Sequence, residues 1–323
     1  MQAERYPKIN IRSKNELAKR LSYKKFPIGD ALRLINDVVD NFDAYWVDNH
    51  SQSKPSRNKY VRSARGTPLG RLLDNINKKI LTPYDKMLPN FIFGGVKGLN
   101  HVKAVYYLLG VSRKRAILRM DIERFFEQIS EERVYHFFHN KCSCSKRAAK
   151  LIASLCCVPQ GPKNSSDSKT IARGFATSPR LAVWCNLDLF IRINYLVNKR
   201  LRGHDPRLAI YVDDIGVTAS RVTKNEMSKL YLEIRDIMEK FDSNQKLPVN
   251  NKTEIIFHDK GMEHLGLKMY RNKLSIGSKT KSKLDKEKHK RRSGSAQSSC
   301  KRYKSLRQYK NHIERWSPVD FNN

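Results

Sequence analysis

The stretch IYVDDIGV, residues 210–217, places two adjacent aspartates inside an apolar segment of a chain with a formal net charge of +33. β-Branched and aromatic residues stand on both sides of the turn-prone pair Asp213–Asp214. This pattern predicts a strand, a two-residue turn at the aspartates and a second strand. Two neighbouring carboxylates repel each other, and burial raises the cost of keeping both charged. We therefore expect a cation between them.

A third carboxylate, Asp121, follows another apolar segment in RMDIERFF. Residues 114–121 are predicted to form a strand that could lie beside the hairpin in one sheet. Three carboxylates at the ends of neighbouring strands can hold two divalent cations about 4 Å apart, and Mg²⁺ suits such a site. One ion would lower the pKa of an attacking 3′-hydroxyl, and the other would neutralise a triphosphate and its leaving pyrophosphate. The pattern predicts two-metal nucleotidyl transfer with Mg²⁺, for which Mn²⁺ could substitute.

The composition of the chain limits the class of protein. Its 323 residues, 39% of them hydrophobic, include 64 Lys and Arg but only 31 Asp and Glu. Such an excess of positive charge attracts polyanions, of which nucleic acid is the most frequent. The absence of an apolar run of about 18 residues argues against a membrane partner. Because the N-terminus lacks a signal-peptide core and the six cysteines form no disulfide framework, we expect a cytoplasmic protein.

Apolar spacing predicts most of the secondary structure. The expected helices lie at 13–21, 28–42, 69–81, 131–141, 145–158, 178–201 and 224–241. The expected strands lie at 114–121, 252–259, 264–270 and 273–278, with a hairpin at 207–220. Residues 159–170 are predicted to form a polar surface loop.

The C-terminal segment from Lys279 to Arg315 contains 14 Lys or Arg and 3 acidic residues. Aromatic and apolar residues alternate with the charges in its second half, which favours a helix that grips nucleic acid. The candidate contacts in this half are Lys301, Arg302, Lys304 and Arg307. A disordered basic tail is the alternative for residues 279–300.

Several motifs together resemble those of bacterial reverse transcriptases. YVDD at 211–214 resembles the Y-x-D-D signature, and MDIERFFEQIS at 120–130 resembles the first aspartate motif. ARGFATSPRLA at 172–182 resembles the P-Q-G-x-x-x-S-P-x-L-A-N motif. LPVNNKTEIIF and HLGLKMY resemble the primer-grip region, and KLSIGSKTKSKL and YKSLRQYKNHI resemble a short thumb. All of them follow in the family's order between residues 59 and 315.

This resemblance implies an α+β right-hand polymerase fold, in which the palm carries an antiparallel sheet. Residues 1–50 would be an N-terminal helical extension, and 51–115 would be the fingers. Residues 116–277 would be the palm, with fingers elements around 130–175, and 278–323 would be a basic thumb.

The resemblance also implies a role for individual residues. Asp121, Asp213 and Asp214, with the backbone carbonyl of Ile122, would bind the metal ions. Phe126 would be a steric gate that rejects the 2′-hydroxyl of ribonucleotides, and Gly174 would allow close approach of the nucleotide. The further candidates for nucleotide contact are Arg173 (in place of the usual Gln), Lys59, Arg62 and the general acid Lys252. Lys97 and Tyr211 are candidates for nucleic-acid contact.

The chain departs from the retron pattern within this family. It has KAVYY at 103–107 where retrons carry N-A-x-x-H, HLG at 264–266 in place of V-T-G, and Val183 in place of Asn. A second PQG at 159–161 is not followed by an apolar helix and is interpreted as part of an insertion. These departures favour the reverse transcriptases associated with phage defence, with retrons as the nearest neighbours.

The expected function is therefore RNA-directed DNA synthesis on a dedicated noncoding RNA in antiphage defence. The expected partners are this RNA, the DNA product and deoxynucleoside triphosphates, with a partner protein or a second copy left open. Alternatives are a retron enzyme that makes an RNA–DNA hybrid, an RNA polymerase, and a partner-dependent protein that binds RNA or polymerises without a template.

Overall fold

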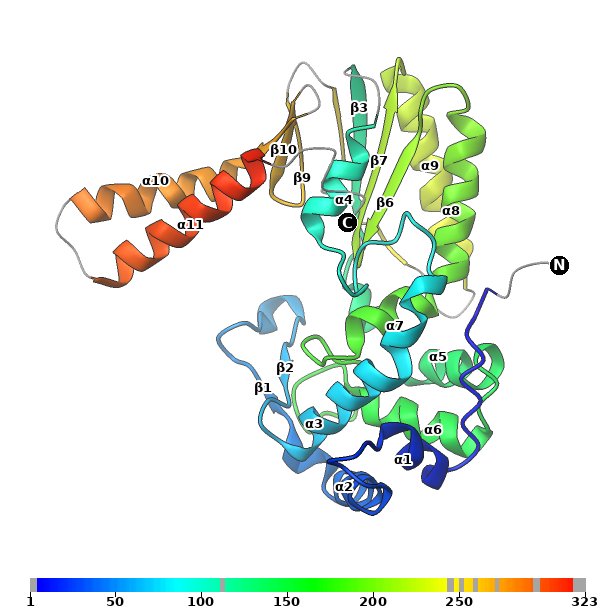
Figure 1. Ribbon diagram of the computed structural model, residues 1–323. Coiled ribbons are helices and arrows are strands. Elements are labelled where there is room, and N and C mark those ends of the chain that lie inside the picture. Colours follow the sequence, from blue (N-terminus) through cyan, green and yellow to red (C-terminus); the bar gives the residue numbers. More distant parts are fainter. Residues whose placement is uncertain are drawn as a thin grey trace. The chain divides into compact units, whose positions relative to one another are not determined.

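The computed structural model describes residues 5–110, 114–242, 247–249, 253–257, 261–270, 273–292 and 297–315. Helices and strands are mixed along the chain, which confirms the predicted α+β class (Figure 1). The chain forms two compact units. The first unit comprises residues 1–98, 124–188 and 243–247, and the second comprises 99–123, 189–242 and 248–323. The division into fingers, palm and thumb stays a prediction.

The first unit is mainly helical. Its α-helices are α1 (Lys14–Leu21), α2 (Ile28–Asp40), α3 (Pro68–Asn75), α5 (Glu131–His136), α6 (Lys146–Cys156) and α7 (Ser178–Cys185). Two short antiparallel pairs accompany them, β1 (Val47–Asp48) with β2 (Arg62–Ser63), and β4 (Cys157–Pro159) with β5 (Lys169–Ile171). Side-chain oxygens of Ser13 and Thr67 accept backbone hydrogen bonds that begin α1 and α3. The helices expected near 13–21, 28–42 and 69–81 are confirmed.

Two expectations in this part of the chain need correction. The segment 159–170 is not wholly a loop, because its ends are residues of β4 and β5, where Val158 pairs with Thr170. The single helix expected at 178–201 is broken at the buried residue Asn186, where α7 ends and α8 (Leu187–Arg200) begins. The Asn186 side-chain amide donates a 2.8 Å hydrogen bond to the carbonyl of Ala182, and its backbone leaves the helical region. An Asn side chain that bonds the preceding turn competes with helix continuation.

The second unit is built around a four-stranded antiparallel sheet (Figure 1). The strand order is β6 (Arg207–Tyr211), β7 (Asp214–Ser220), β3 (Arg115–Asp121) and β8 (Glu254–Phe257). Helix α4 (His101–Leu108) packs against β6 and β7, and the Thr218 hydroxyl donates a 2.7 Å hydrogen bond to the carbonyl of Leu108. Helix α9 (Lys224–Lys240) begins with a capping box and is joined to α8 by the Arg200–Glu233 ion pair. These contacts fix the positions of the strands, and therefore of the acidic residues at the ends of the strands.

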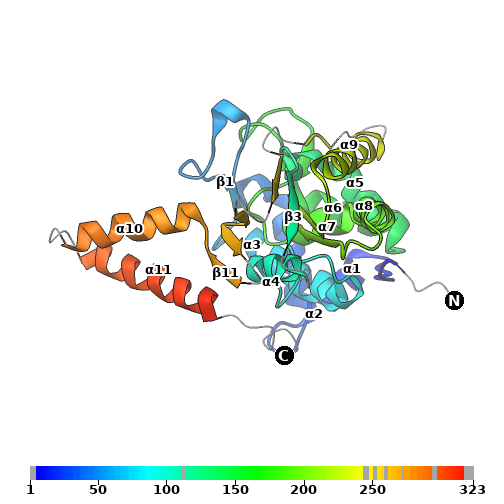
Figure 2. The same cartoon turned by 90° about the horizontal axis from the view of Figure 1, so that it is seen from above.

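A small sheet and a helical hairpin complete the second unit. Strands β9 (Met262–His264), β10 (Leu267–Tyr270) and β11 (Lys273–Ile276) form an antiparallel sheet. Helices α10 (Ser278–Arg292) and α11 (Gln297–Arg315) follow and run side by side (Figures 1 and 2). The alternative of a disordered tail is therefore wrong for 279–292 and 297–300. In the part of the chain that the structure describes, none of the helices has the length and apolarity needed to span a bilayer.

Candidate active site

Two neighbouring strands of the second unit bring the three predicted aspartates to one end of its sheet. The register of β3 and β7 pairs Asp121 with Asp214 directly. Asp213 lies in the turn before β7, and its carbonyl accepts a 2.9 Å hydrogen bond from the buried Ile122 backbone N–H. The strand pairing thus collects acids that are 92 residues apart in the chain.

The turn itself differs from the prediction. Tyr211 pairs with Asp214, so the two turn residues are Val212 and Asp213 rather than the two aspartates. Val212 has φ +60°, a left-handed conformation that is strained for a β-branched residue. The hairpin therefore places one aspartate in a strained turn and the other on a regular strand.

The electrostatics of this end of the sheet fit a bound cation. Burial, followed by the charges of Asp213 and Asp121, raises the pKa of Asp214 to about 7, and Arg119 opposes this shift. Among the described residues, no three His, Cys, Asp or Glu side chains are arranged as a complete metal cluster. The carboxylate oxygens are nevertheless the ligands that Mg²⁺ prefers, and a divalent ion would remove the repulsion between them. The predicted general acid Lys252 lies outside the described residues.

A histidine that the sequence did not single out connects Tyr211 to helix α11. His101 Nε2 lies 2.8 Å from the Tyr309 hydroxyl, and the two rings are stacked with centroids 6.2 Å apart. The His101 ring also meets Tyr211 edge-on at 6.4 Å. Burial lowers the pKa of His101 and raises the pKa of Tyr309, so a neutral hydrogen-bonded pair is favoured. In the sequence, the capping residue Asn100 indicates the start of α4. It does not indicate that His101 contacts Tyr309 and Tyr211.

Arg62 is enclosed by partners within the first unit. Its side chain is 2% exposed and forms a 2.7 Å ion pair with Asp48. Its guanidinium also donates to the carbonyls of Pro159 and Gly161, so the second PQG serves as an acceptor within the first unit. The rings of Trp46 and Tyr60 lie beside it. These contacts support a stabilising role for Arg62 in place of the predicted triphosphate contact.

We expect Arg62→Ala to lower the free energy of unfolding by about 3 kcal/mol or more, because it leaves the Asp48 carboxylate buried without its partner. Arg65→Ala, three residues further on at an exposed position, should change it by less than about 0.5 kcal/mol. Urea unfolding followed by tryptophan fluorescence measures both. Equal effects of the two substitutions would contradict the stabilising role.

The other predicted lysines are accessible. Lys59 is partly exposed, and its backbone pairs with Lys54 at the end of a short loop. Lys97 is exposed, while its backbone N–H donates to Asp85. Their predicted contacts with nucleotide and nucleic acid stay predictions, as do those of the exposed residues of α11. These are Lys301, Arg302, Lys304 and Arg307.

Gly174 has little room for a side chain. Its φ is +108°, and a Cβ atom would lie 2.3 Å from the carbonyl oxygen of Arg62. The hydroxyl of Ser178, the first residue of α7, donates a 2.6 Å hydrogen bond to the Ala172 carbonyl. The segment 172–178 is therefore restricted both by the close approach of Gly174 to Arg62 and by the hydrogen bond between Ser178 and Ala172.

We expect Gly174→Ala to lower the free energy of unfolding by about 3 kcal/mol, since it adds a backbone clash to an unfavourable φ. The matched control is Gly98→Ala, at φ +79° with no atom within 4 Å, for which we expect about 1 kcal/mol. Thermal and urea unfolding measure the difference. Equal losses would show that close approach to Arg62 does not limit this position.

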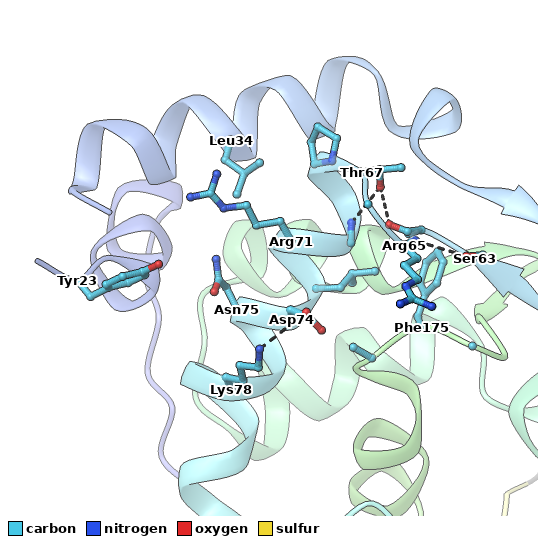
Figure 3. A pocket seen from close by; sticks show the side chains of 17 residues that line it. Tyr23, Leu34, Ser63, Arg65, Thr67, Arg71, Asp74, Asn75, Lys78 and Phe175 are labelled. Atoms are coloured by element: carbon cyan, nitrogen blue, oxygen red, sulfur yellow. Dashed lines mark hydrogen bonds and ion pairs between the residues drawn. The ribbon is translucent and has the colours of Figure 1, made fainter. Parts of the chain in front are cut away.

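A cavity of about 740 Å³ in the first unit lies beside this loop (Figure 3). Its size is within the range of ligand sites, about 300–1,000 Å³. The cations Arg65, Arg71 and Lys78 line it together with the polar residues Thr67, Asp74 and Asn75, the aromatic residues Tyr23 and Phe175, and Gly174. Arg65 lines this cavity, whereas the predicted nucleotide contacts Lys59 and Arg62 do not. Burial of Arg62 depends on distant partners, which a local pattern does not reveal.

The chain is 25% identical over 199 residues to the retron Ec48 reverse transcriptase of Escherichia coli. The match covers 59% of this chain and 44% of that relative, so it spans less than half of the relative's length. No protein-family model matches the chain. The similarity confirms the predicted resemblance to bacterial reverse transcriptases, and it favours their retron-like branch.

Proposed function

We propose that this protein is an RNA-directed DNA polymerase. The observation that carries the proposal is the pairing of Asp121 with Asp214 on adjacent strands, with Asp213 in the connecting turn. Similarity to a retron reverse transcriptase supports the same reaction class. The second unit would contain the palm sheet of a right-hand polymerase, and α10 and α11 would act as its thumb.

Asp121, Asp213 and Asp214, with the carbonyl of Ile122, would hold Mg²⁺, and Mn²⁺ could substitute for it. When bound, the metal would supply activation of the primer 3′-hydroxyl and neutralisation of the triphosphate charge. Phe126 would exclude a 2′-hydroxyl. The cavity cations Arg65, Arg71 and Lys78 would attract phosphate groups of the nucleotide or template.

The template that we propose is a dedicated noncoding RNA, and the biological setting is antiphage defence, as the family resemblance implies. A retron-type product, in which RNA and DNA stay joined, is the second form of the same activity. The alternative is a partner-dependent protein that binds RNA, or that polymerises nucleotides without a template. Such a protein would use its basic surface to bind RNA but would not copy the RNA into DNA.

The test uses protein purified with the RNA that accompanies it from its native locus. Mg²⁺ and labelled deoxynucleotides are added with and without an RNA template carrying a DNA primer, and RNA and product are sequenced. We expect a discrete product whose sequence is complementary to one RNA, and its absence from Asp213→Asn protein. A bound RNA without any DNA product, together with refusal of the added primer–template, would contradict polymerase activity and favour RNA binding.

The basic helix α11 should add a salt-dependent contribution to RNA binding. Each phosphate contact removed lowers the slope of log K against log [salt] by about 0.7–0.9. The double variant Lys304→Ala/Arg307→Ala should therefore reduce the slope by about 1.5 and weaken binding to all sequences alike. The control Lys224→Ala/Lys229→Ala removes the same charge from exposed positions of α9. Equal slopes for both double variants would argue against α11 as a nucleic-acid contact.

A further inference from the structure

Arg173 occupies the position where bacterial reverse transcriptases, which this chain resembles, carry Gln. In this chain its side chain contacts two neighbouring residues of another segment, Phe126 and Glu127. Its guanidinium lies 4.7 Å from the centre of the Phe126 ring. Its Nε and Nη2 atoms donate to the two carboxylate oxygens of Glu127 at 3.3 and 3.2 Å. One side chain thus packs on the predicted gate ring and binds the residue next to it.

Low exposure and a backbone hydrogen bond fix this arrangement within the first unit. The Glu127 side chain is 6% exposed and that of Arg173 is 17% exposed, so their ion pair is largely shielded from water. The carbonyl of Arg173 accepts a 2.7 Å hydrogen bond from the backbone N–H of Arg62. A two-point contact between a guanidinium and a carboxylate fixes the plane of the guanidinium as well as its position.

The Phe126 ring is confined as a result. It is 8% exposed and meets Phe125 edge-on, with centroids 6.2 Å apart and planes at 63°. Arg173 adds an attractive contact with the ring face, since a cation over an aromatic ring is stabilised by the ring quadrupole. The charge of Arg173 is already balanced by Glu127, which leaves it less suited to neutralising a triphosphate.

We propose that Arg173 is a positioning residue that sets sugar selectivity through Phe126, with Glu127 as its anchor. The inference rests on the proposed polymerase function and on Phe126 as the gate. A steric gate rejects one hydroxyl group only if its ring does not move aside when that group presses against it. Arg173 therefore makes selection against ribonucleotides strict without itself touching the nucleotide.

The experiment compares kcat/KM for dGTP and GTP on one RNA template with a DNA primer. The proteins are the unmodified chain and the variants Arg173→Gln, Glu127→Gln, Phe126→Ala and Phe126→Ala/Arg173→Gln. We expect Arg173→Gln and Glu127→Gln each to lower the dGTP/GTP ratio about tenfold, mainly by raising kcat/KM for GTP. In the Phe126→Ala background, Arg173→Gln should produce no further change in the ratio. Arg173→Lys keeps a cation near the ring without the two-point contact, so its dGTP/GTP ratio should lie between those of the unmodified protein and Arg173→Gln. This variant also tests the proposal if Arg173→Gln does not fold.

Four other results would overturn the proposal in distinguishable ways. If Arg173→Gln raises KM for both nucleotides equally and leaves the ratio unchanged, Arg173 contacts the triphosphate directly. If it lowers the ratio further in the Phe126→Ala background, it acts independently of the ring. If the unmodified protein incorporates neither nucleotide, the polymerase function fails and the inference fails with it. If it incorporates both nucleotides without sugar selection, the polymerase function stands, but the gate and the inference that rests on it are lost.

Discussion

Asp213→Asn should reduce deoxynucleotide incorporation at least about 10³-fold, because it removes a charged oxygen from the group proposed to hold the metal ions. Loss of several kcal/mol of charge stabilisation in the transition state corresponds to a rate loss of this size. The folded structure should persist, since Asn keeps the size of the side chain and Asp213 lies in a turn. The measurement is primer extension on an RNA template in single-turnover conditions.

The matched control for this substitution is Asp236→Asn on α9. Asp236 is an exposed partner of Lys240 at one-turn spacing, and loss of such a pair costs little. It should leave incorporation within twofold of the unmodified protein. Undiminished synthesis by Asp213→Asn would contradict the assignment of the aspartates, whereas loss of RNA binding by the same variant would indicate a folding defect.

Asp214→Asn should stabilise the metal-free protein at pH 8. The folded-state pKa of Asp214 is raised to about 7 from its ordinary value of 3.8. Between these values the folded state holds a proton that the unfolded state has lost, so stability falls as pH rises through this window. A shift of this size corresponds to up to about 4 kcal/mol, and the neutral Asn side chain would avoid this loss. Urea unfolding at pH 5 and pH 8 measures the change.

Magnesium should stabilise the unmodified chain more than it stabilises Asp214→Asn. A cation that binds only the folded state stabilises it, and it should do so for the unmodified chain more than for Asp214→Asn. The variant should also show a flatter dependence of stability on pH between 4 and 7. An unfolding free energy that falls equally with pH in both proteins would show that Asp214 is not the group responsible.

Sequence patterns predicted the elements that depend on near neighbours. The amphipathic helices at 14–40, the strand that ends at Asp121 and the hairpin around Asp213 and Asp214 all follow from local periodicity. Their positions also allowed the three acids to meet at the ends of neighbouring strands of one sheet, which the pairing of β3 with β7 bears out for Asp121 and Asp214. The order of motifs gave the resemblance that the retron relative confirmed.

The exact turn and the helix break were not readable from the same patterns. The turn falls on Val212 and Asp213 because the cross-strand register, and not turn propensity, fixes which residues face each other. The long apolar helix divides at Asn186 because one side-chain amide bonds the preceding turn. The position of the turn depends on one strand pairing, and the break depends on one hydrogen bond. Hydrophobic periodicity describes a whole segment and does not indicate such a single contact.

The sequence by itself thus determined which acids could act together and that the chain carries a large positive charge. Only the tertiary structure decided which of the positive side chains are accessible. Arg62 is enclosed by Asp48 and two carbonyls, Arg173 is bound to Glu127 over Phe126, and Arg65 lines a cavity. These three arginines are alike in sequence, and what separates them is burial among partners that lie up to 99 residues away along the chain.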